Sequence, residues 1–369
     1  MKVMFVFGTR PEAIKMAPLV KAVQGEKDMK AIVCVTAQHR EMLDQVLELF
    51  DITPDYDLNL MKAGQSLSDI TAGVLKGLEE ILINDRPDLL LVHGDTTTTL
   101  SAALAAFYQQ VPVGHVEAGL RSGNVYSPYP EEMNRLLATR IADIHFAATS
   151  GNVENLIREN VDAKKIFKTG NTVIDALKMM IEEDYKFENP MLNTIDYDGE
   201  MVMLMTAHRR ENLGEPMREI FRAIRDIIDA HPKARLIFPM HLNPNVRAVA
   251  RDYFDHHDRI HLIEPMEYKA FANLQGRVKL ILTDSGGIQE EAPALGKPVV
   301  VLRTETERPE AVEAGTVVIA GVSYDGVKRE IEKLVVDEAH YHKMSEAVNP
   351  YGDGTACEKI INSIKIYYC

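Results

Sequence analysis

Residues 285–291 combine a serine, two glycines and two glutamates between two short apolar runs. The runs at 280–282 and 298–302 are typical of buried parallel strands, and Gly296 is a helix-ending residue between them. We therefore expect a strand, a glycine turn, a short helix and a second strand in this order.

The entrance of that short helix has the chemistry of a phosphate-binding turn. Backbone N–H groups around Ser285, Gly286 and Gly287 would point out of a helix N-terminus, which attracts anions, and glycine lets the backbone approach closely. Glu291, one turn further on, could accept both hydroxyls of a ribose. The alternative is that Glu290 and Glu291 only complement the helix dipole, so the motif alone leaves both interpretations open.

Three carboxylates in the first half of the chain stand where proton-transfer groups could be. Asp95 follows the apolar run 89–93, but it could also be a plain helix N-cap. Glu117 lies between an apolar run and a glycine segment, where a carboxylate loses hydration unless it is paired. Its partner could be Arg121. Glu131 stands four residues before Arg135, which is also the spacing of an ordinary helix ion pair.

Basic side chains follow other apolar runs. Arg10 comes directly after the first run, and Lys15, which could also be only a solvated surface charge, lies in the helix expected next. The segment lacks the glycine pattern of dinucleotide-binding turns, so oxidation by a nicotinamide cofactor is disfavoured. His208, beside two arginines, suggests an anion site or a proton donor, although a structural role is equally open for it and for His241. Arg308 could reach a phosphate or anchor its own loop.

The elements that must position these residues alternate between apolar runs and segments of helical period. This pattern predicts an α/β fold with doubly wound parallel sheets, in which ligands bind beyond the carboxyl ends of the strands. A length of 369 residues favours two domains, which we place at 1–172 plus the C-terminal helix 354–369 and at 173–353. The acidic segment at 179–200 contains Asn-Pro and Asp-Gly breakers and places the hinge near 170–200. The expected strands are 3–7, 31–36, 89–93, 111–116, 144–147 and 166–168, then 201–206, 235–239, 260–263, 279–283, 298–302 and 317–320.

Composition excludes several classes of protein. A net charge of −14 argues against a large nucleic-acid footprint, and no apolar run approaches the roughly 18 residues of a membrane span. The N-terminus lacks the organisation of a signal peptide, so we expect a cytoplasmic protein without membrane association. Cys34, Cys357 and Cys369 are too widely spaced for a zinc site or a disulfide framework.

Seven motifs taken together resemble the non-hydrolysing UDP-N-acetylglucosamine 2-epimerases. In order they are FGTRPEAIKMAPL, HGDTTTT, HVEAGLRS, YPEEMNR, TAHRREN, LTDSGGIQEEAPALGKP and TERPEA, and the match covers almost the whole chain. The resemblance implies the GT-B fold, with two Rossmann-like domains facing across a cleft and the last helix returning to the first domain. It also implies a homodimer, no cofactor and no metal.

The resemblance implies that UDP-GlcNAc and UDP-ManNAc are interconverted by elimination and re-addition of UDP. The implied catalytic residues are Asp95, Glu117 and Glu131 as acid/base groups, and His208 near the diphosphate, where it would assist the departure and return of UDP. Arg10, Lys15 and Arg308 would hold the substrate, while Ser285, Gly286 and Gly287 would hold the phosphates and Glu291 the ribose. Met266 and Phe271 would meet the uracil.

Bacterial members of this family are often activated by a second UDP-GlcNAc, and the matching positions here are Gln38, Arg209 and His241. Glu41 and Gly64 depart from regulated members, so control of this kind stays open. A hydrolysing 2-epimerase and a GT-B glycosyltransferase remain alternatives, because the nucleotide half of their site would look much the same. A non-catalytic nucleotide-sugar sensor would have no need of the carboxylates.

Overall fold

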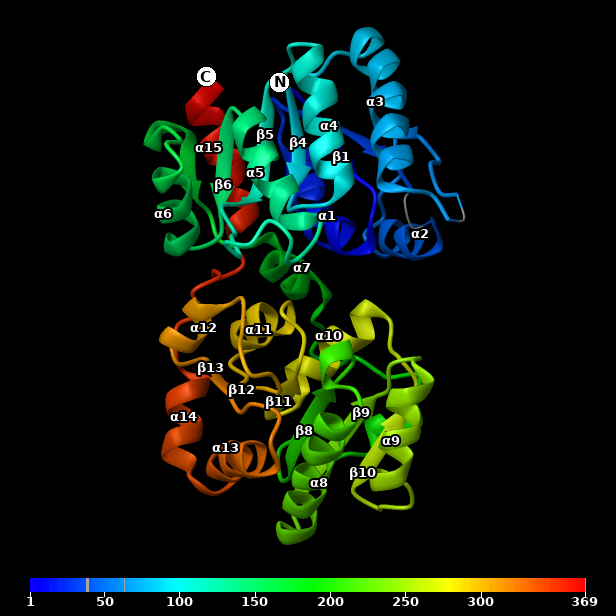
Figure 1. Ribbon diagram of the computed structural model, residues 1–369, viewed down its shortest axis with the longest axis vertical. Coiled ribbons are helices and arrows are strands. Elements are labelled where there is room, and N and C mark those ends of the chain that lie inside the picture. Colours follow the sequence, from blue (N-terminus) through cyan, green and yellow to red (C-terminus); the bar gives the residue numbers. More distant parts are fainter. Residues whose placement is uncertain (38–39, 63, 369) are drawn as a thin grey trace. The chain divides into compact units, whose positions relative to one another are not determined.

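Two compact units make up the protein in the computed structural model, which describes residues 1–37, 40–62 and 64–368 (Figure 1). The first unit comprises Met1–Met179 and Tyr351–Cys369, and the second comprises Met180–Pro350. The boundary thus falls at the end of helix α7 (Thr172–Met180), and not before it as the sequence suggested. Asp175 gives the physical reason, because its carboxylate accepts hydrogen bonds from the backbone of Ala356 and Cys357 in the C-terminal helix of the same unit.

The first unit is built on a seven-stranded parallel sheet with the order β3-β2-β1-β4-β5-β6-β7. Its strands are β1 Lys2–Phe7, β2 Lys30–Val35, β3 Tyr56–Asp57, β4 Leu89–His93, β5 Val113–Ala118, β6 Ile144–Ala147 and β7 Ile166–Lys168. The pair-wise registers are all parallel, from β1 against β2 to β6 against β7. Each connection therefore has to cross back over the sheet, which is what the intervening helices do.

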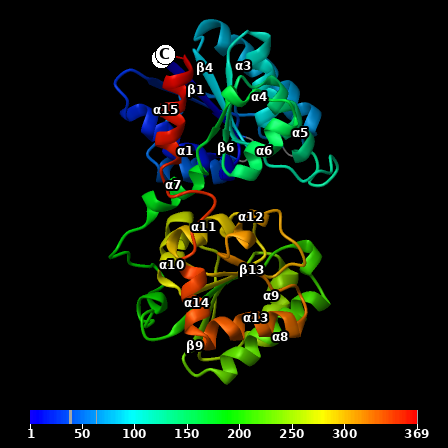
Figure 2. The ribbon, with the colours of Figure 1, turned by 90° about the vertical axis from the view of Figure 1, so that its left-hand side faces the viewer.

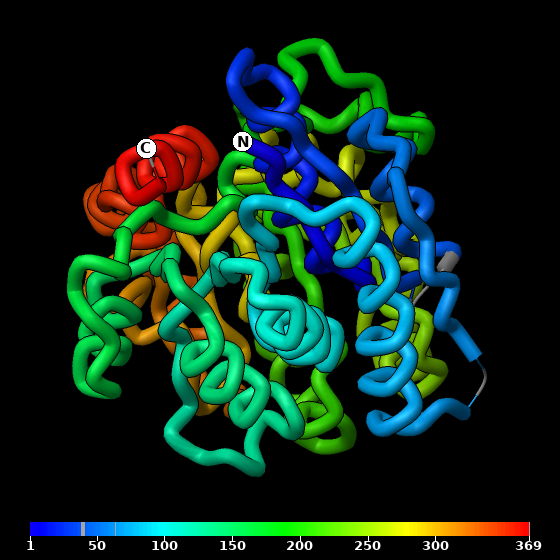
Figure 3. Tube along the Cα trace, turned by 90° about the horizontal axis from the view of Figure 1, so that it is seen from above, coloured from blue at the N-terminus to red at the C-terminus, as the bar shows by residue number. Residues whose placement is uncertain are grey.

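Helices of the first unit follow its strands in the order of the chain. They are α1 Arg10–Gly25, α2 Arg40–Leu49, α3 Leu67–Asn84, α4 Thr97–Tyr108, α5 Glu131–Ile141, α6 Ser150–Arg158, α7 and α15 Ala356–Tyr368. Alternate strand residues such as Met4, Val6 and Leu90 form one buried cluster with Leu78 of α3 and Ala102 of α4. Viewed from above, α3 and α4 lie side by side (Figure 3). Together they cover one face of the sheet, as the two-residue period of a strand requires.

The last helix, α15, packs against α1 within the first unit (Figure 2). Its apolar residues Ile360, Ile361 and Ile364 are buried. The chain thus returns to the unit in which it started, and α15 completes the cover of that unit.

The second unit has a six-stranded parallel sheet with the order β10-β9-β8-β11-β12-β13. The strands are β8 Met201–Thr206, β9 Ala234–Pro239, β10 Ile260–Ile263, β11 Leu280–Thr283, β12 Val299–Val301 and β13 Val317–Ile319. Its helices are α8 Glu215–Ala230, α9 Pro244–Phe254, α10 Tyr268–Arg277, α11 Ile288–Glu291, α12 Pro309–Glu313, α13 Tyr324–Val336 and α14 Glu338–Ser345. Phe221, Phe238 and Phe254 meet in its core, with ring centroids 5.7 and 4.9 Å from that of Phe221.

Strand β3 was not predicted, and strand β5 lies two residues later in the chain than predicted. Strand β3 has two residues at the edge of the sheet, too few to show an alternating pattern. Strand β5 begins later than predicted because the backbone N–H of Val111 still donates to Ala106 of α4, and it runs on through Glu117 to Ala118. None of the helices in the described part of the chain combines the length and the apolar composition that a membrane span needs.

Candidate active site

Each sheet has a point where the strand order reverses, and the candidate residues gather there. In the first unit the reversal lies between β1 and β4, and in the second unit between β8 and β11. Helices leave the two central strands in opposite directions at such a point, which opens a crevice at the carboxyl ends of the strands. Arg10 follows β1, Asp95 follows β4, His208 follows β8 and Ser285 follows β11.

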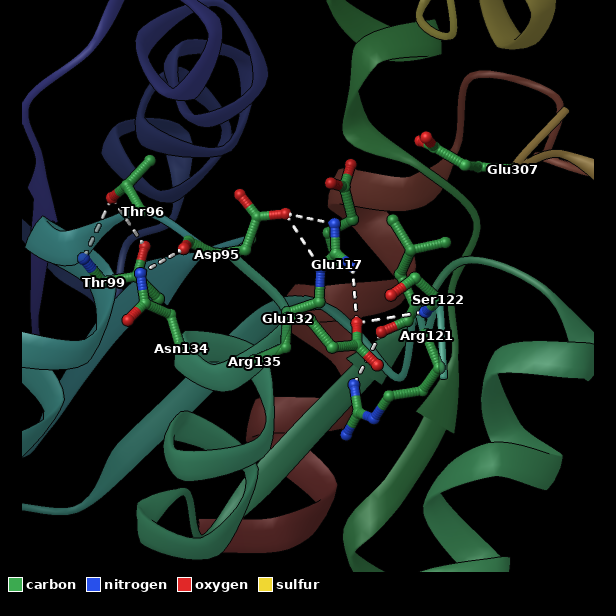
Figure 4. Close-up of polar contacts among 12 residues, drawn as sticks. Asp95, Thr96, Thr99, Glu117, Arg121, Ser122, Glu132, Asn134, Arg135 and Glu307 are labelled. Carbon is green, nitrogen blue, oxygen red and sulfur yellow. Dashed lines mark hydrogen bonds and ion pairs between the residues drawn. The ribbon is translucent and has the colours of Figure 1, made fainter. Parts of the chain in front are cut away.

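Asp95 is held by an arginine from α5 (Figure 4). The Arg135 Nη2 and Nε atoms lie 2.7 and 2.9 Å from Asp95 Oδ2, and Asn134 Nδ2 donates to the Asp95 carbonyl at 2.8 Å. The Arg135 Nη1 atom also donates to Glu132 Oε2 at 2.8 Å. Arg135 is buried, and these two carboxylates raise its pKa even though desolvation by burial lowers it. A charge-assisted contact of this kind fixes the carboxylate at the strand tip.

Two simpler interpretations of these residues are wrong. The N-cap of α4 is Thr96, whose side chain accepts from the backbone of Thr99, so Asp95 is not the capping residue. Arg135 contacts Asp95 and Glu132 and is not the helix partner of Glu131. Glu131 opens α5, and its Oε2 atom is buried with no hydrogen-bond partner within the described residues.

Glu117 occupies a β-bulge in strand β5. The register of β5 against β6 shifts between Val116 and Ala118, and Glu117 has a φ of 62°. A non-glycine residue in the left-handed region costs on the order of 1–3 kcal/mol and is characteristic of functional sites. The Glu117 side chain lies close to the Gly94 backbone, since a Cβ built on Gly94 would lie 3.7 Å from Glu117 Oε1.

The Glu117 carboxylate is paired with Lys15 of α1, and Asn171 Nδ2 donates to its Oε2 atom at 2.8 Å. Lys15 is therefore not a solvated surface charge. Arg121, the partner suggested by sequence, instead forms a two-pronged contact with Glu159, at 2.7 Å from Nε to Oε1 and 2.8 Å from Nη2 to Oε2. Sequence spacing could not separate these pairs because Lys15 and Glu117 come from distant parts of the chain.

Glu12 is a site-supporting residue that the sequence analysis did not single out. It is buried, and its Oε2 atom accepts from the backbone of Gly8 and Thr9 at 3.1 and 2.9 Å. Its Oε1 atom accepts from the Thr96 and Thr99 hydroxyls at 2.7 and 3.2 Å. Burial raises the pKa of Glu12, while these hydrogen bonds act in the opposite direction. The network joins the turn after β1 to the turn after β4. The capping-box pattern of Thr9 and Glu12 predicts the contacts of Glu12 with the first of these turns, but not those with the second.

In the second unit, His208 is anchored by a buried aspartate that sequence reasoning also missed. His208 Nδ1 lies 3.1 Å from Asp284 Oδ1, while the backbone N–H groups of His208 and Arg209 each donate to Asp284 Oδ2 at 2.8 Å. Burial raises the pKa of Asp284, but the contacts with His208 and the backbone outweigh it and the net shift is downward. The position of Asp284 at the end of β11 was the available signal.

His241 stacks on His208, with ring centroids 5.6 Å apart. Burial is the main cause that lowers the pKa of His241, and the nearby His208 lowers it further. The Arg209 Nε atom is buried without a hydrogen-bond partner in the described ranges. Gln38, the third residue expected at an activating site, lies outside the described residues.

The segment 280–302 has the predicted order of strand, turn, short helix and strand, and Gly296 ends its helical part with a φ of 67°. Glu290 is buried and pairs with Arg308, so it does more than complement a helix dipole. The Arg308 guanidinium lies over the turn, because a Cβ on Gly286 would come within 3.6 Å of Nη2. Glu291 accepts from Gln275 Nε2 at 3.2 Å.

Met266 and Phe271, the two residues expected to contact the uracil, lie just before α10 and within it. Met266 lines a cavity of about 400 Å³ together with Tyr185, Phe187 and Ala270, and Phe271 lies in the first turns of α10, partly exposed. The cavity lies within the second unit. Its lining is part aromatic and part acidic.

Residues 1–37, 40–62 and 64–368 contain no group of three His, Cys, Asp or Glu side chains that could hold a metal ion. Cys34 and Cys357 are buried free thiols, and burial raises the pKa of Cys34 to about 12. Cys369 lies outside the described residues.

Known proteins are similar to this chain over almost its whole length. Residues 21–365 match the family model described as UDP-N-acetylglucosamine 2-epimerase. The UDP-N-acetylglucosamine 2-epimerase of Escherichia coli is 54% identical over 371 residues, which covers 99% of this chain and 98% of that protein.

Solved structures give the same result. An S. aureus protein solved with UDP has a TM-score of 0.89 and 52% identity, covering 99% of this chain and 96% of that one. A UDP-GlcNAc 2-epimerase from Neisseria meningitidis bound to UDP-GlcNAc has a TM-score of 0.87 and 48% identity, covering 99% and 100%. The predicted class, an α/β protein of GT-B type with two doubly wound parallel sheets, is thereby confirmed. Full-length identity at this level shows that the chain belongs to the UDP-N-acetylglucosamine 2-epimerase family.

Proposed function

We propose that this protein interconverts UDP-GlcNAc and UDP-ManNAc by inverting C2 of the sugar. The observation that carries the proposal is the pair of carboxylates Asp95 and Glu117 at the tips of adjacent strands, each engaged by its own cation, Arg135 and Lys15. A glycosyltransferase or a sensor needs the nucleotide-binding residues but has no use for such a pair.

The chemistry of C2 explains why carboxylates are needed. The C2 proton adjoins no carbonyl group, so its removal alone would leave an unstabilised carbanion. If a carboxylate takes this proton while the C1–O bond breaks, the C–H electrons form a C1=C2 double bond and UDP leaves with the C1–O electrons. UDP then adds back to C1 of the neutral glycal, and a proton delivered to the opposite face of C2 gives the epimer.

Two faces of C2 require more than one proton-transfer group, and Asp95, Glu117 and Glu131 are the candidates in the first unit. The Glu131 Oε2 atom is buried and has no hydrogen-bond partner in the described part of the chain. Departing UDP would be held by the second unit, through Ser285, Gly286, Gly287 and Arg308 at the phosphates, Glu291 at the ribose, and Met266 and Phe271 at the uracil. Arg10 would hold the substrate from the first unit.

His208 would assist the departure and return of UDP. Asp284 occupies its Nδ1 side, which leaves Nε2 for the diphosphate. Arg209 follows His208 in the sequence, and His241 stacks on it. These two residues would contact an activating second UDP-GlcNAc. The product would supply ManNAc units for cell-surface polysaccharides, from a cytoplasmic enzyme.

The reaction is tested by incubating pure protein with UDP-GlcNAc in D2O and following the sugar by NMR. We expect UDP-ManNAc that carries deuterium at C2. Free ManNAc would indicate a hydrolysing enzyme, and a need for an added acceptor would indicate a glycosyltransferase. Unchanged, undeuterated sugar would leave only binding and would refute the proposal.

The carboxylates are tested by Asp95→Asn and Glu117→Gln. Each should lower turnover by at least about 100-fold, because removal of a general acid or base typically costs 10²–10⁴. UDP affinity, measured by calorimetry, should stay close to that of the wild type since the nucleotide is bound by the second unit. Glu159→Gln is the matched control, because this carboxylate is also paired with an arginine but away from the strand tips. Loss of UDP binding in a folded variant would show that the residue was misassigned.

We also propose a homodimer that forms through the first unit. Phe107 and Tyr108 end α4 with side chains 60% and 63% exposed, and they line a cavity of about 510 Å³ that reaches Ile141. Gathered apolar surface of this kind marks association sites. Tyr108→Lys should shift sedimentation equilibrium toward the monomer, whereas Ile366→Lys, on exposed α15 surface, should not. An unchanged dimer in Tyr108→Lys would place the interface elsewhere.

A further inference from the structure

Glu117 is approached by polar side chains from three different elements of the first unit. Lys15 comes from α1, His93 from the last position of β4, and Asn171 from the turn before α7. All three contact or face the same carboxylate atom, Oε2. The left-handed backbone of Glu117 lies in an irregular bulge, so the regular strand geometry does not aim its side chain. Its direction has to be set by these neighbours.

Asn171 is fixed at both ends of its amide. The side chain is 3% exposed, its Oδ1 atom accepts from the backbone of Val173 at 3.1 Å, and its Nδ2 atom donates to Glu117 Oε2 at 2.8 Å. Acceptance of a backbone N–H by Oδ1 settles which end of the amide faces Glu117. The backbone N–H of Asn171 also donates to the Tyr351 carbonyl at 2.7 Å, so the main chain is held as well.

His93 is buried and faces Glu117 without a hydrogen bond. It is 4% exposed, its Nε2 atom lies 3.6 Å from Glu117 Oε2, and this atom has no hydrogen-bond partner among the residues described. Burial lowers the pKa of His93 to about 4, with Lys15 acting in the same direction and Glu117 and Asp95 acting against it. The imidazole is therefore neutral at pH 7. A buried polar atom without a partner is unfavourable, so its persistence calls for a reason.

We propose that Asn171 and His93 are positioning residues for Glu117. Asn171 holds Oε2 in place before proton transfer, and His93, in the tautomer protonated on Nε2, donates to the carboxylate when it moves by a fraction of an ångström during the reaction. The inference rests on the proposed function, since it assigns these residues through the proton transfer of Glu117.

Asn171→Ala tests the first half of the proposal. We expect kcat to fall about 10- to 100-fold, as for a small misplacement of a reacting group, while KM for UDP-GlcNAc is unchanged. A lost donor disfavours the carboxylate form, so the limb of the pH–rate profile that reports Glu117 should move to higher pH. Asn171→Asp adds a negative charge at the same position and should move this limb further in the same direction. Both variants keep the other charged or titratable groups near Glu117, which are Lys15, His93 and Asp95.

Asn193→Ala is the matched control for Asn171. Its amide is also fixed at both ends, by the N–H of Phe187 at 3.0 Å and the carbonyl of Phe187 at 2.8 Å, but it lies in the second unit. It should leave kcat and the pH profile as in the wild type. A purely structural Asn171 would change the melting temperature without moving the pH profile, and that result would overturn the assignment.

His93→Phe tests the second half and separates stability from activity. Replacing a buried imidazole that has an unpaired nitrogen by an apolar ring should leave the melting temperature equal or higher. Turnover should nevertheless fall about 10-fold, because the carboxylate loses its donor during the reaction. His145→Phe is the control, since His145 is also buried in the sheet but contacts the Thr139 carbonyl and not Glu117. Wild-type turnover in His93→Phe would overturn the role of His93.

Deuterium incorporation by the wild type is measured first, so that failure of the proposed function can be distinguished from failure of the positioning roles. If the wild type does not place deuterium at C2, the proposed function fails. If the wild type exchanges and both Asn171→Ala and His93→Phe keep its kcat and pH profile, the function stands and the positioning roles fail.

Discussion

Asp284 shows how much one buried carboxylate organises in the second unit. It is fully buried, its Oδ2 atom accepts two backbone N–H groups, and its Oδ1 atom lies 3.1 Å from His208 Nδ1. Asp284→Asn should lower the free energy of unfolding at pH 7 by about 2 kcal/mol, because it removes charge-assisted hydrogen bonds from a buried site. Urea denaturation followed at a probe in the second unit measures this loss.

The pH dependence of the Asp284 effect has a defined sign. The folded pKa lies below the ordinary 3.8, so the stabilisation is present above pH 3.8 and is lost as the pH falls through the folded value. The difference between wild type and Asp284→Asn should therefore be constant at neutral pH and shrink below about pH 4. Asp255→Asn, at an exposed helix end, serves as the control with little effect at any pH. A difference that grows on acidification would contradict the assignment.

At the scale of elements, helix α15 depends on a cap from another helix. Asp175 of α7 accepts from the N–H groups of Ala356 and Cys357, at 3.2 and 2.9 Å. Asp175→Ala should destabilise the first unit by about 1–2 kcal/mol, as loss of an N-cap does, and should speed amide exchange in the first turn of α15. Asp175→Asn keeps one acceptor and should show a smaller effect. Unchanged exchange in Asp175→Ala would mean that packing against α1 alone holds the helix.

At the scale of the whole molecule, each unit has a hydrophobic core of its own. Leu78 is fully buried in the core of the first unit and Phe221 in that of the second. Leu78→Ala should destabilise its unit by about 2–5 kcal/mol and Phe221→Ala by about 3–5 kcal/mol. In calorimetry each substitution should lower the transition of its own unit. UDP should raise the transition affected by Phe221→Ala, since a ligand stabilises the unit that binds it. Equal shifts of one shared transition would contradict independent cores.

The parts of the site that could be read from sequence are those carried by local pattern. Apolar runs placed β4 and β8 correctly, and the position after a parallel strand identified Asp95, His208 and the Ser285 turn as candidates. Pairing could not be read in this way. The spacing of Glu131 and Arg135 suggested a helix pair, whereas Arg135 reaches Asp95, forty residues earlier in the chain.

The sequence by itself determined the alternation of strands and helices, the family and the types of residue at the strand ends. Hydrophobic periodicity and motif order are local properties, so they can be read from the amino-acid sequence alone. Only the tertiary structure decided that Lys15, His93 and Asn171 converge on Glu117, that Glu12 joins two turns, and that Asp284 anchors His208. These contacts depend on the order of strands in the sheet and on a one-residue bulge, and both are set by packing between segments far apart in the chain.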